Sequence, residues 1–271
     1  MLSQTLKLMS LIVVGLVLSG CFDSHRTTDA VCEDNPELAC DKLNADGQCR
    51  VTRVNLIWWR YENKTDQSMP RYIGEYERIS DYSQCLSVAI QIEPKSDSRT
   101  KVDRVKAFDY AMSEKSRIES IIRASNTAEA YYFLWSQLGD RQAKNQFIKL
   151  EGTPALEKPQ MQYALATYYT TSNLEKAMGY LHRSLELSNE KTAMPVVYSA
   201  LASLYYKQNQ YEASYVWTSV AKLSDKEKVA ENQMLNVLFE FPEEEKERLE
   251  EQAETFLDNI HDGIYKRPKS Y

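Results

Sequence analysis

One segment of this chain occurs twice, and the repeat limits what the chain can fold into more than any other feature. Residues 159–169 read PQMQYALATYY, and residues 195–205 read PVVYSALASLY, 36 residues further along. Each copy opens with a proline, which favours the first turn of a helix. A second run follows each copy, and Ala177 in the first run aligns with Ala213 in the second. The pattern predicts antiparallel helix pairs that stack, because one pair of this size cannot bury its apolar face alone.

These units resemble tetratricopeptide repeats, in which about 34 residues form a helix, a turn and a second helix. A degenerate copy is indicated upstream by Tyr131, Tyr132, Phe133, Ala143 and Phe147. In such an α-solenoid the first helix of each pair lines a concave surface that binds partners. The residues that we expect on this surface are Gln162, Thr170, Tyr206 and Gln208. A plain helical bundle with a coincidental similarity is the alternative.

The rest of the chain also has the pattern of an all-α protein. Glycine is scarce, with 8 in 271 residues, and apolar residues recur at helical spacing over 101–124. Two further helices are predicted over 51–62 and 71–92, and a polar linker over 93–100. Near the C-terminus, Pro242 is expected to open a helix whose apolar face closes the stack.

The N-terminus has the features of a bacterial lipoprotein signal. Lys7 precedes an apolar run over 8–18, and Leu18-Ser-Gly is followed directly by Cys21. The run is shorter than the roughly 20 apolar residues that span a membrane. We therefore expect residues 1–20 to be removed and Cys21 to be lipidated; the alternatives are an uncleaved anchor and a chance cysteine after an ordinary signal peptide. The resemblance to lipoproteins implies several acyl chains and, since Phe22 and not Asp follows, the outer membrane facing the periplasm.

A secretory signal directs a chain to an oxidising compartment, where cysteines are expected to form disulfides. After Cys21 the chain has four cysteines: Cys32, Cys40, Cys49 and Cys85. Three pairings into two disulfides are possible. Reduced thiols are an alternative, and so is a zinc site, which is disfavoured because no histidine lies near these cysteines in the sequence.

The two N-terminal helices indicate which pairing forms. In an antiparallel hairpin, the residue numbers of any two residues that face each other add up to the same value. Glu62 and Tyr72 flank the expected turn and their numbers add to 134, as do those of Cys49 and Cys85. The register therefore predicts a Cys49–Cys85 disulfide and leaves Cys32–Cys40 to close a small loop.

The most aromatic stretch of the chain is Leu56-Ile-Trp-Trp-Arg-Tyr61. Adjacent helical residues cannot both point inward, so Trp58 or Trp59 is expected to be exposed beside Arg60. Tryptophan and arginine are enriched among the residues that dominate binding interfaces. We interpret these three residues as a second candidate contact surface, and partial burial in the core is the alternative.

No motif for catalysis or metal binding is found. The three histidines, His25, His182 and His261, lie far apart, and no zinc, nucleophile-elbow or phosphate-loop motif is present. Part of a calcium loop could be read around Asp46, but the terminal glutamate is missing and a turn at Asp46-Gly47 fits better.

The formal net charge of −6 disfavours nucleic acid as a partner. The sequence thus predicts a protein that is not an enzyme and has no cofactor or metal.

A wider resemblance covers nearly the whole chain after Cys21. The stretches NPEL at 35–38, DGQCR at 46–50, GTPALE at 152–157 and LATYY at 165–169 are similar to a family of uncharacterised gammaproteobacterial lipoproteins, a domain of unknown function. The resemblance implies no activity and supplies no functional residue beyond the lipidated Cys21.

Four parts are therefore expected. They are a signal peptide over 1–20, a lipidated tether over 21–31, a disulfide-stapled helical region over 32–92 and a repeat region with its capping helix over 101–262. The expected function is a membrane-anchored scaffold or adaptor that binds another envelope protein. A peptidoglycan- or lipid-binding module is the alternative, and a hydrolase with an unrecognised site is a weaker one. Neither the oligomeric state nor the partner follows from the sequence.

Overall fold

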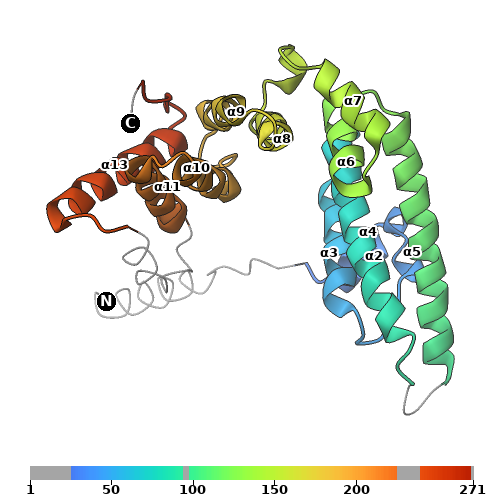
Figure 1. Cartoon of the computed structure of the whole chain (residues 1–271). Coiled ribbons are helices and arrows are strands. Elements are labelled where there is room, and N and C mark those ends of the chain that lie inside the picture. Colours follow the sequence, from blue (N-terminus) through green and yellow to red (C-terminus); the bar gives the residue numbers. More distant parts are fainter. Residues whose placement is uncertain (1–25, 94–97, 225–238, 270–271) are drawn as a thin grey trace, which may run out of the picture. The chain divides into compact units, whose positions relative to one another are not determined.

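The computed structural model describes residues 26–93, 98–224 and 239–269, and every regular element in these ranges is helical (Figure 1). The α-helices are α2 (Thr28–Asp34), α3 (Arg50–Glu62), α4 (Met69–Ala89), α5 (Ser98–Ala124), α6 (Ala128–Leu138), α7 (Arg141–Lys149), α8 (Pro159–Tyr169), α9 (Leu174–Glu186), α10 (Pro195–Lys207), α11 (Tyr211–Ser224) and α13 (Glu243–His261). Short 3-10 helices are η1 (Pro36–Leu38), η2 (Cys40–Lys42) and η3 (Pro154–Leu156). The predicted all-α class is confirmed.

The signal peptide and Cys21 lie outside the described residues. The prediction of a tether up to residue 31 is wrong at its end, because α2 begins at Thr28. The Thr27 side chain accepts a hydrogen bond from the Ala30 amide, and Val31 is fully buried, so a cap and a core contact order this segment. None of the helices in the described ranges combines the length and the apolar character that a membrane span requires.

The chain divides into two compact units, which we treat separately: an N-terminal unit up to Ser120 and a C-terminal unit from Ile121. In the N-terminal unit, α3 and α4 form the expected antiparallel hairpin. The Cys49–Cys85 disulfide joins their ends with a Cα–Cα distance of 5.7 Å, and Cys32–Cys40 closes the small loop. Both predicted disulfides are confirmed.

The helix predicted up to Ile92 ends at Ala89, and Arg104 of α5 binds the turn that follows. Its guanidinium donates hydrogen bonds to the carbonyl oxygens of Ala89 and Ile92, at 2.9 and 3.1 Å, and pairs with Asp46 at 2.7 Å. The side chain is buried, and its bond to the Ala89 carbonyl adds to the one that this oxygen accepts from the Ile92 amide at 3.2 Å. One residue thus holds together α4, α5 and the loop between the cysteines.

The C-terminal unit consists of successive helix pairs, with α6 packed on α7, α8 on α9 and α10 on α11. Residues of the expected kind define the helix ends. Asp140 accepts hydrogen bonds from the amides at the start of α7, and Gly139 ends α6 in the left-handed region at φ 68°. Pro159 and Pro195 each occupy the first position of a helix, as the repeat predicted.

Several positions related by the 36-residue repeat are buried in both copies. Leu165 and Leu201 are both fully buried, and Ala177 and Ala213 are equally inaccessible. Leu181 and its counterpart Trp217 are also buried, although their side chains differ greatly in volume. The repeated sequence therefore encodes a repeated packing arrangement in these two helix pairs.

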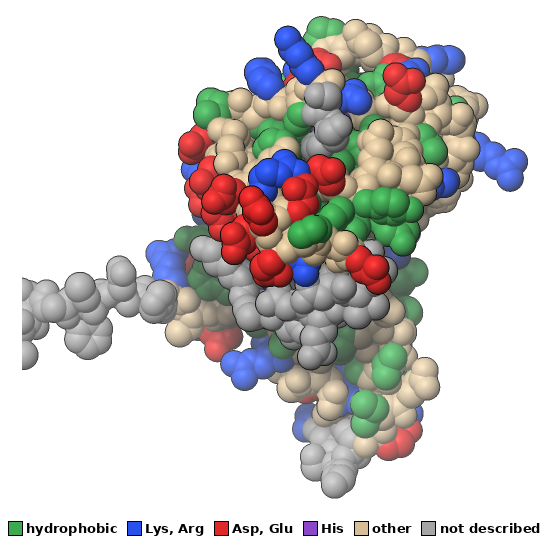
Figure 2. Space-filling model, turned by 60° about the vertical axis from the view of Figure 1, so that its left-hand side comes forward, with side chains coloured by type: hydrophobic (Ala, Val, Ile, Leu, Met, Phe, Trp, Pro, Cys, Tyr) green, Lys and Arg blue, Asp and Glu red, His purple; other side chains and the backbone are tan. Residues whose placement is uncertain are grey.

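The last helix, α13, packs on α11 through Leu249, Ala253 and Ile260, the apolar face that the sequence predicted. Its other face is rich in glutamate, and acidic side chains gather on the surface that Figure 2 brings forward. Three glutamates stand in the first turn, where the helix dipole favours negative charge. These features fit a terminal helix with one buried and one solvated face.

Candidate functional site

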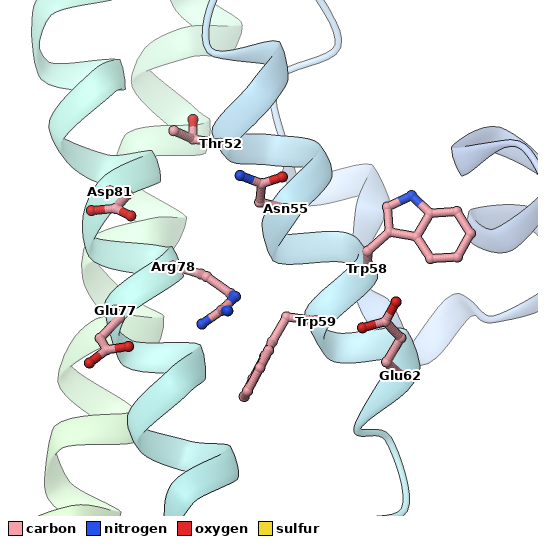
Figure 3. Close-up of a pocket in the computed structure, with 8 residues that line it drawn as sticks. All are labelled: Thr52, Asn55, Trp58, Trp59, Glu62, Glu77, Arg78 and Asp81. Atoms are coloured by element: carbon pink, nitrogen blue, oxygen red, sulfur yellow. The ribbon is translucent and has the colours of Figure 1, made fainter. Parts of the chain in front are cut away.

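An open groove of about 560 Å³ runs between α3 and α4 in the N-terminal unit (Figure 3). It is lined from α3 by Thr52, Asn55, Trp58, Trp59 and Glu62, and from α4 by Glu77, Arg78 and Asp81. Two of the three residues predicted as an aromatic contact surface, Trp58 and Trp59, thus lie at a groove.

Trp59 packs at the place where the two helices approach most closely. A Cβ atom on Gly74 would lie 2.2 Å from Cζ2 of Trp59, so only glycine leaves room for the indole. The indole nitrogen donates a hydrogen bond to the Arg71 carbonyl at 3.2 Å, and the Arg78 guanidinium lies 3.8 Å from the ring centroid. Trp59 is therefore a half-buried part of the hairpin with a cation stacked on its ring.

Trp58 points away from Trp59, as expected for neighbours on one helix (Figure 3). Its indole nitrogen donates to the hydroxyl of Thr28 at 3.2 Å, and its ring meets Tyr61 edge to face at 5.7 Å. Since both indole nitrogens bond within the protein, the two rings offer aromatic surface to the groove and not their polar ends.

Arg60 does not belong to a contact surface, and that part of the prediction is wrong. Only 6% of the residue is exposed. Its guanidinium pairs with Glu75 at 2.7 Å and donates to the Leu38 carbonyl at 3.0 Å and to the Tyr110 hydroxyl at 3.2 Å. Because these partners lie on η1, α4 and α5, Arg60 joins the elements of the N-terminal unit from inside.

A second open groove, of about 340 Å³, lies in the C-terminal unit. Its lining includes Tyr205, Gln208 and Gln210 from the end of α10 and the turn after it, Glu175 from α9, and Arg267 with Lys269 from the C-terminal segment. Tyr206 lies beside Gln208 in the chain and is 44% exposed, with its ring edge to face against Tyr211 at 5.4 Å. The predicted residues Tyr206 and Gln208 are thus accessible.

Of the other two residues predicted on the concave surface, Gln162 is not available to a partner, whereas Thr170 is half-buried. Gln162 is 3% exposed, and its amide nitrogen donates to the Leu156 carbonyl at 2.8 Å. Thr170 is half-buried, and its hydroxyl donates to the Ala166 carbonyl of its own helix at 2.9 Å. In each case the polar group satisfies backbone near a helix end, which the repeat alignment does not reveal.

His182 is buried at the centre of an aromatic cluster. Its Nδ1 atom lies 2.9 Å from the Tyr265 hydroxyl, and its Nε2 atom lies 2.8 Å from the Tyr205 hydroxyl. Burial, together with the nearby charge of Arg267, lowers the pKa of His182 to about 3. A histidine held neutral between two tyrosines fastens the C-terminal segment onto α9 and α10.

A polar cluster connects the segment after α7 to α8 and α9. Glu151 accepts hydrogen bonds from the hydroxyls of Tyr169 and Tyr180, and Lys176 pairs with it at 2.5 Å. Burial and the bond to Glu151 raise the pKa of Tyr180, and the bond to Glu151 raises that of Tyr169. A tyrosine that acts as a base at neutral pH needs a lowered pKa. Because the pKa values of both tyrosines are raised, the cluster fits a structural role.

Among the described residues, no group of three or more His, Cys, Asp or Glu side chains is placed to hold a metal ion. The turn at Asp46-Gly47 is present, since the Asp46 carboxylate accepts from the Gln48 amide at 2.7 Å. The same carboxylate accepts from Asn44 and from Arg104. Its oxygens are therefore occupied by protein donors.

Sequence reasoning missed the α4 wall of the first groove. Glu77 and Asp81 are four residues apart, so they share one face of a helix, and that spacing was a usable signal. It was insufficient alone, because a charged helix face is ordinarily just solvated. Only the hairpin register places this face opposite Trp59 and Glu62.

A family model described as a protein of unknown function (DUF2989) matches residues 18–219. Comparison with curated proteins finds no match, and comparison with solved structures finds none either.

Proposed function

The chain belongs to the DUF2989 family, a domain of unknown function, and we propose that it acts as a lipid-anchored adaptor that binds another protein of the bacterial envelope. Cys21 carries the anchor in this proposal, and the protein faces the periplasm from the outer membrane of a gammaproteobacterium. The C-terminal unit serves as a tetratricopeptide-like binding module. Binding proceeds without catalysis or a cofactor.

The observation that carries the proposal is the accessible aromatic pair at the turn between α10 and α11. Tyr206 and Tyr211 are each 44% exposed and stand beside the groove that Gln208 and Gln210 line. Exposed tyrosines are enriched at protein interfaces, since each offers a large apolar area at a small loss of side-chain entropy. The amide side chains add donors and acceptors for a peptide backbone.

The repeated packing of α8 with α9 and of α10 with α11 supports a tetratricopeptide-like module. In such arrays each pair buries its neighbour's apolar face and presents its first helix to partners. A peptidoglycan-binding role has less support. Sugars stack on the faces of aromatic rings, and the Arg78 guanidinium already covers one face of Trp59, at 3.8 Å from the ring centroid.

Cross-linking in living cells tests the proposal. A photoreactive amino acid is placed at Gln208 and, in a second variant, at Gln210, because the two residues line the same groove. The control is Glu254, an exposed residue of α13 in the same unit. One envelope protein captured from both groove positions and not from Glu254 would support the adaptor. No protein adduct from either position, combined with retention of the purified protein on peptidoglycan, would refute it and favour the glycan-binding alternative.

A further inference from the structure

The groove between α3 and α4 carries an excess of negative charge. Glu62 on one wall and Glu77 with Asp81 on the other are exposed. None of these three carboxylates takes part in an ion pair within the described part of the chain, whereas many other acidic residues there do. Exposed carboxylates that line a concave surface focus a negative potential into it. The groove is therefore complementary to a positively charged ligand.

The floor of this groove already holds one cationic group. Arg78 is the lone basic residue of the described lining, and it is engaged twice, stacked at 3.8 Å on Trp59 and donating to the Gly74 carbonyl at 2.9 Å. With one guanidinium against three carboxylates, a negative charge remains. The stack also shows that a guanidinium fits against this indole.

The end of the hairpin that the disulfide closes is apolar. Val51 and Val88 are 72% and 61% exposed. Val51 precedes Asn55 by four residues and Val88 follows Asp81 by seven, so each valine lies on the helix face that lines the groove. Along the groove, acidic walls thus lead to two exposed valines.

We propose that this groove binds a short segment of a partner protein in which basic residues are followed by an apolar residue. The basic side chains pair with Glu62, Glu77 and Asp81, and the apolar one covers Val51 and Val88. From Glu77 to Val88 the helix rises by about 16 Å, which an extended segment of about five residues spans. The site lies on the N-terminal unit and does not depend on the adaptor surface proposed for α10.

A pair of matched peptides tests the site on the full chain. The probe is acetyl-Lys-Arg-Lys-Leu-Val-amide, and its control carries glutamate at the three basic positions. Each is titrated into isotope-labelled protein while backbone amide resonances are followed, a measurement that detects weak binding and locates it. The basic peptide should shift amides of α3 and α4 along the groove, and the acidic peptide should not.

Two double variants with the same charge change separate the groove from general electrostatics. Glu77→Gln with Asp81→Asn should weaken binding about 2- to 30-fold, since an exposed ion pair contributes about 0.2–1 kcal/mol. Glu251→Gln with Glu254→Gln, at exposed positions of α13, should leave it unchanged. Amide spectra of the free variants check that each remains folded.

The proposal is overturned if the basic peptide shifts no amides of the groove, if the acidic peptide shifts them equally, or if the two double variants behave alike. Substitution of Val88 by serine tests the apolar end and should weaken binding of the same peptide. Because the adaptor proposal is tested by cross-linking at Gln208, either proposal can fail while the other survives.

Discussion

The neutral state of His182 makes the stability of the C-terminal unit depend on pH. In the folded chain burial lowers the pKa of this imidazole to about 3, whereas its ordinary value is 6.5. Between these two values the unfolded chain binds a proton that the folded chain does not. The stability that the neutral His182 imidazole gives to the folded chain is therefore fully present above pH 6.5 and is lost as the pH falls towards 3.

The size of the effect follows from the two pKa values. One pKa unit corresponds to about 1.36 kcal/mol, and pH 5.0 lies 1.5 units below the ordinary pKa. Lowering the pH from 7.5 to 5.0 should thus reduce the free energy of unfolding by about 2 kcal/mol through this residue. His182→Gln removes the titration, while the amide can still bond to Tyr205 and Tyr265.

The assay is urea unfolding of the full chain at both pH values, followed by tryptophan fluorescence. Trp217 is a local probe because its ring contacts His182 at a centroid distance of 5.7 Å. The comparison uses the change with pH within each protein, so any stability lost by the substitution itself cancels. His261→Gln is the matched control, since it removes an imidazole from the same unit and leaves the tyrosine–histidine–tyrosine chain in place. If the His182 variant loses as much stability on acidification as the unmodified chain, the reasoning is refuted.

Three further predictions concern packing and covalent structure, each read from urea denaturation midpoints of the full chain. Gly74→Ala should destabilise by about 1–3 kcal/mol, because its Cβ would lie 2.2 Å from Trp59; a gain, the ordinary result of this change in a helix, would contradict the close approach. Replacing Cys49 and Cys85 together by serine should cost about 3–4 kcal/mol, since the bridge closes a separation of 36 residues; an unchanged midpoint would argue against that constraint. Leu201→Ala should cost about 2–5 kcal/mol, given that the side chain is fully buried; a loss well under 1 kcal/mol would mean that the core tolerates the cavity.

The disulfides and the helix pairs were predictable because their signals are local and periodic. Cys49 and Cys85 pair because the turn after Glu62 sets the hairpin register, which can be counted along the chain. Leu165 and Leu201 are both fully buried, as the apolar spacing of each predicted helix indicates. In both cases neighbouring residues carry the information.

The candidate contact residues were predicted less well. Trp58 and Trp59 do lie at a groove, but Arg60 next to them is buried. Helical spacing places Arg60 on a different face of α3 from Trp59. The spacing does not show that Glu75, Tyr110 and the Leu38 carbonyl lie next to that face. A buried arginine needs partners from several elements, and these come together only in the folded unit.

What the sequence by itself determined is the helical class, the prolines that open α8 and α10, the two disulfides and the apolar faces, since each depends on a few neighbouring residues. Tertiary structure decided which polar residues are used internally and which remain open to solvent. Gln162 in α8 and Gln208 directly after α10 are the same residue type, and one is buried against a carbonyl while the other lines a groove. The physical reason is that a polar side chain is buried only where the fold supplies a hydrogen-bonding partner, and that supply depends on elements distant in the chain.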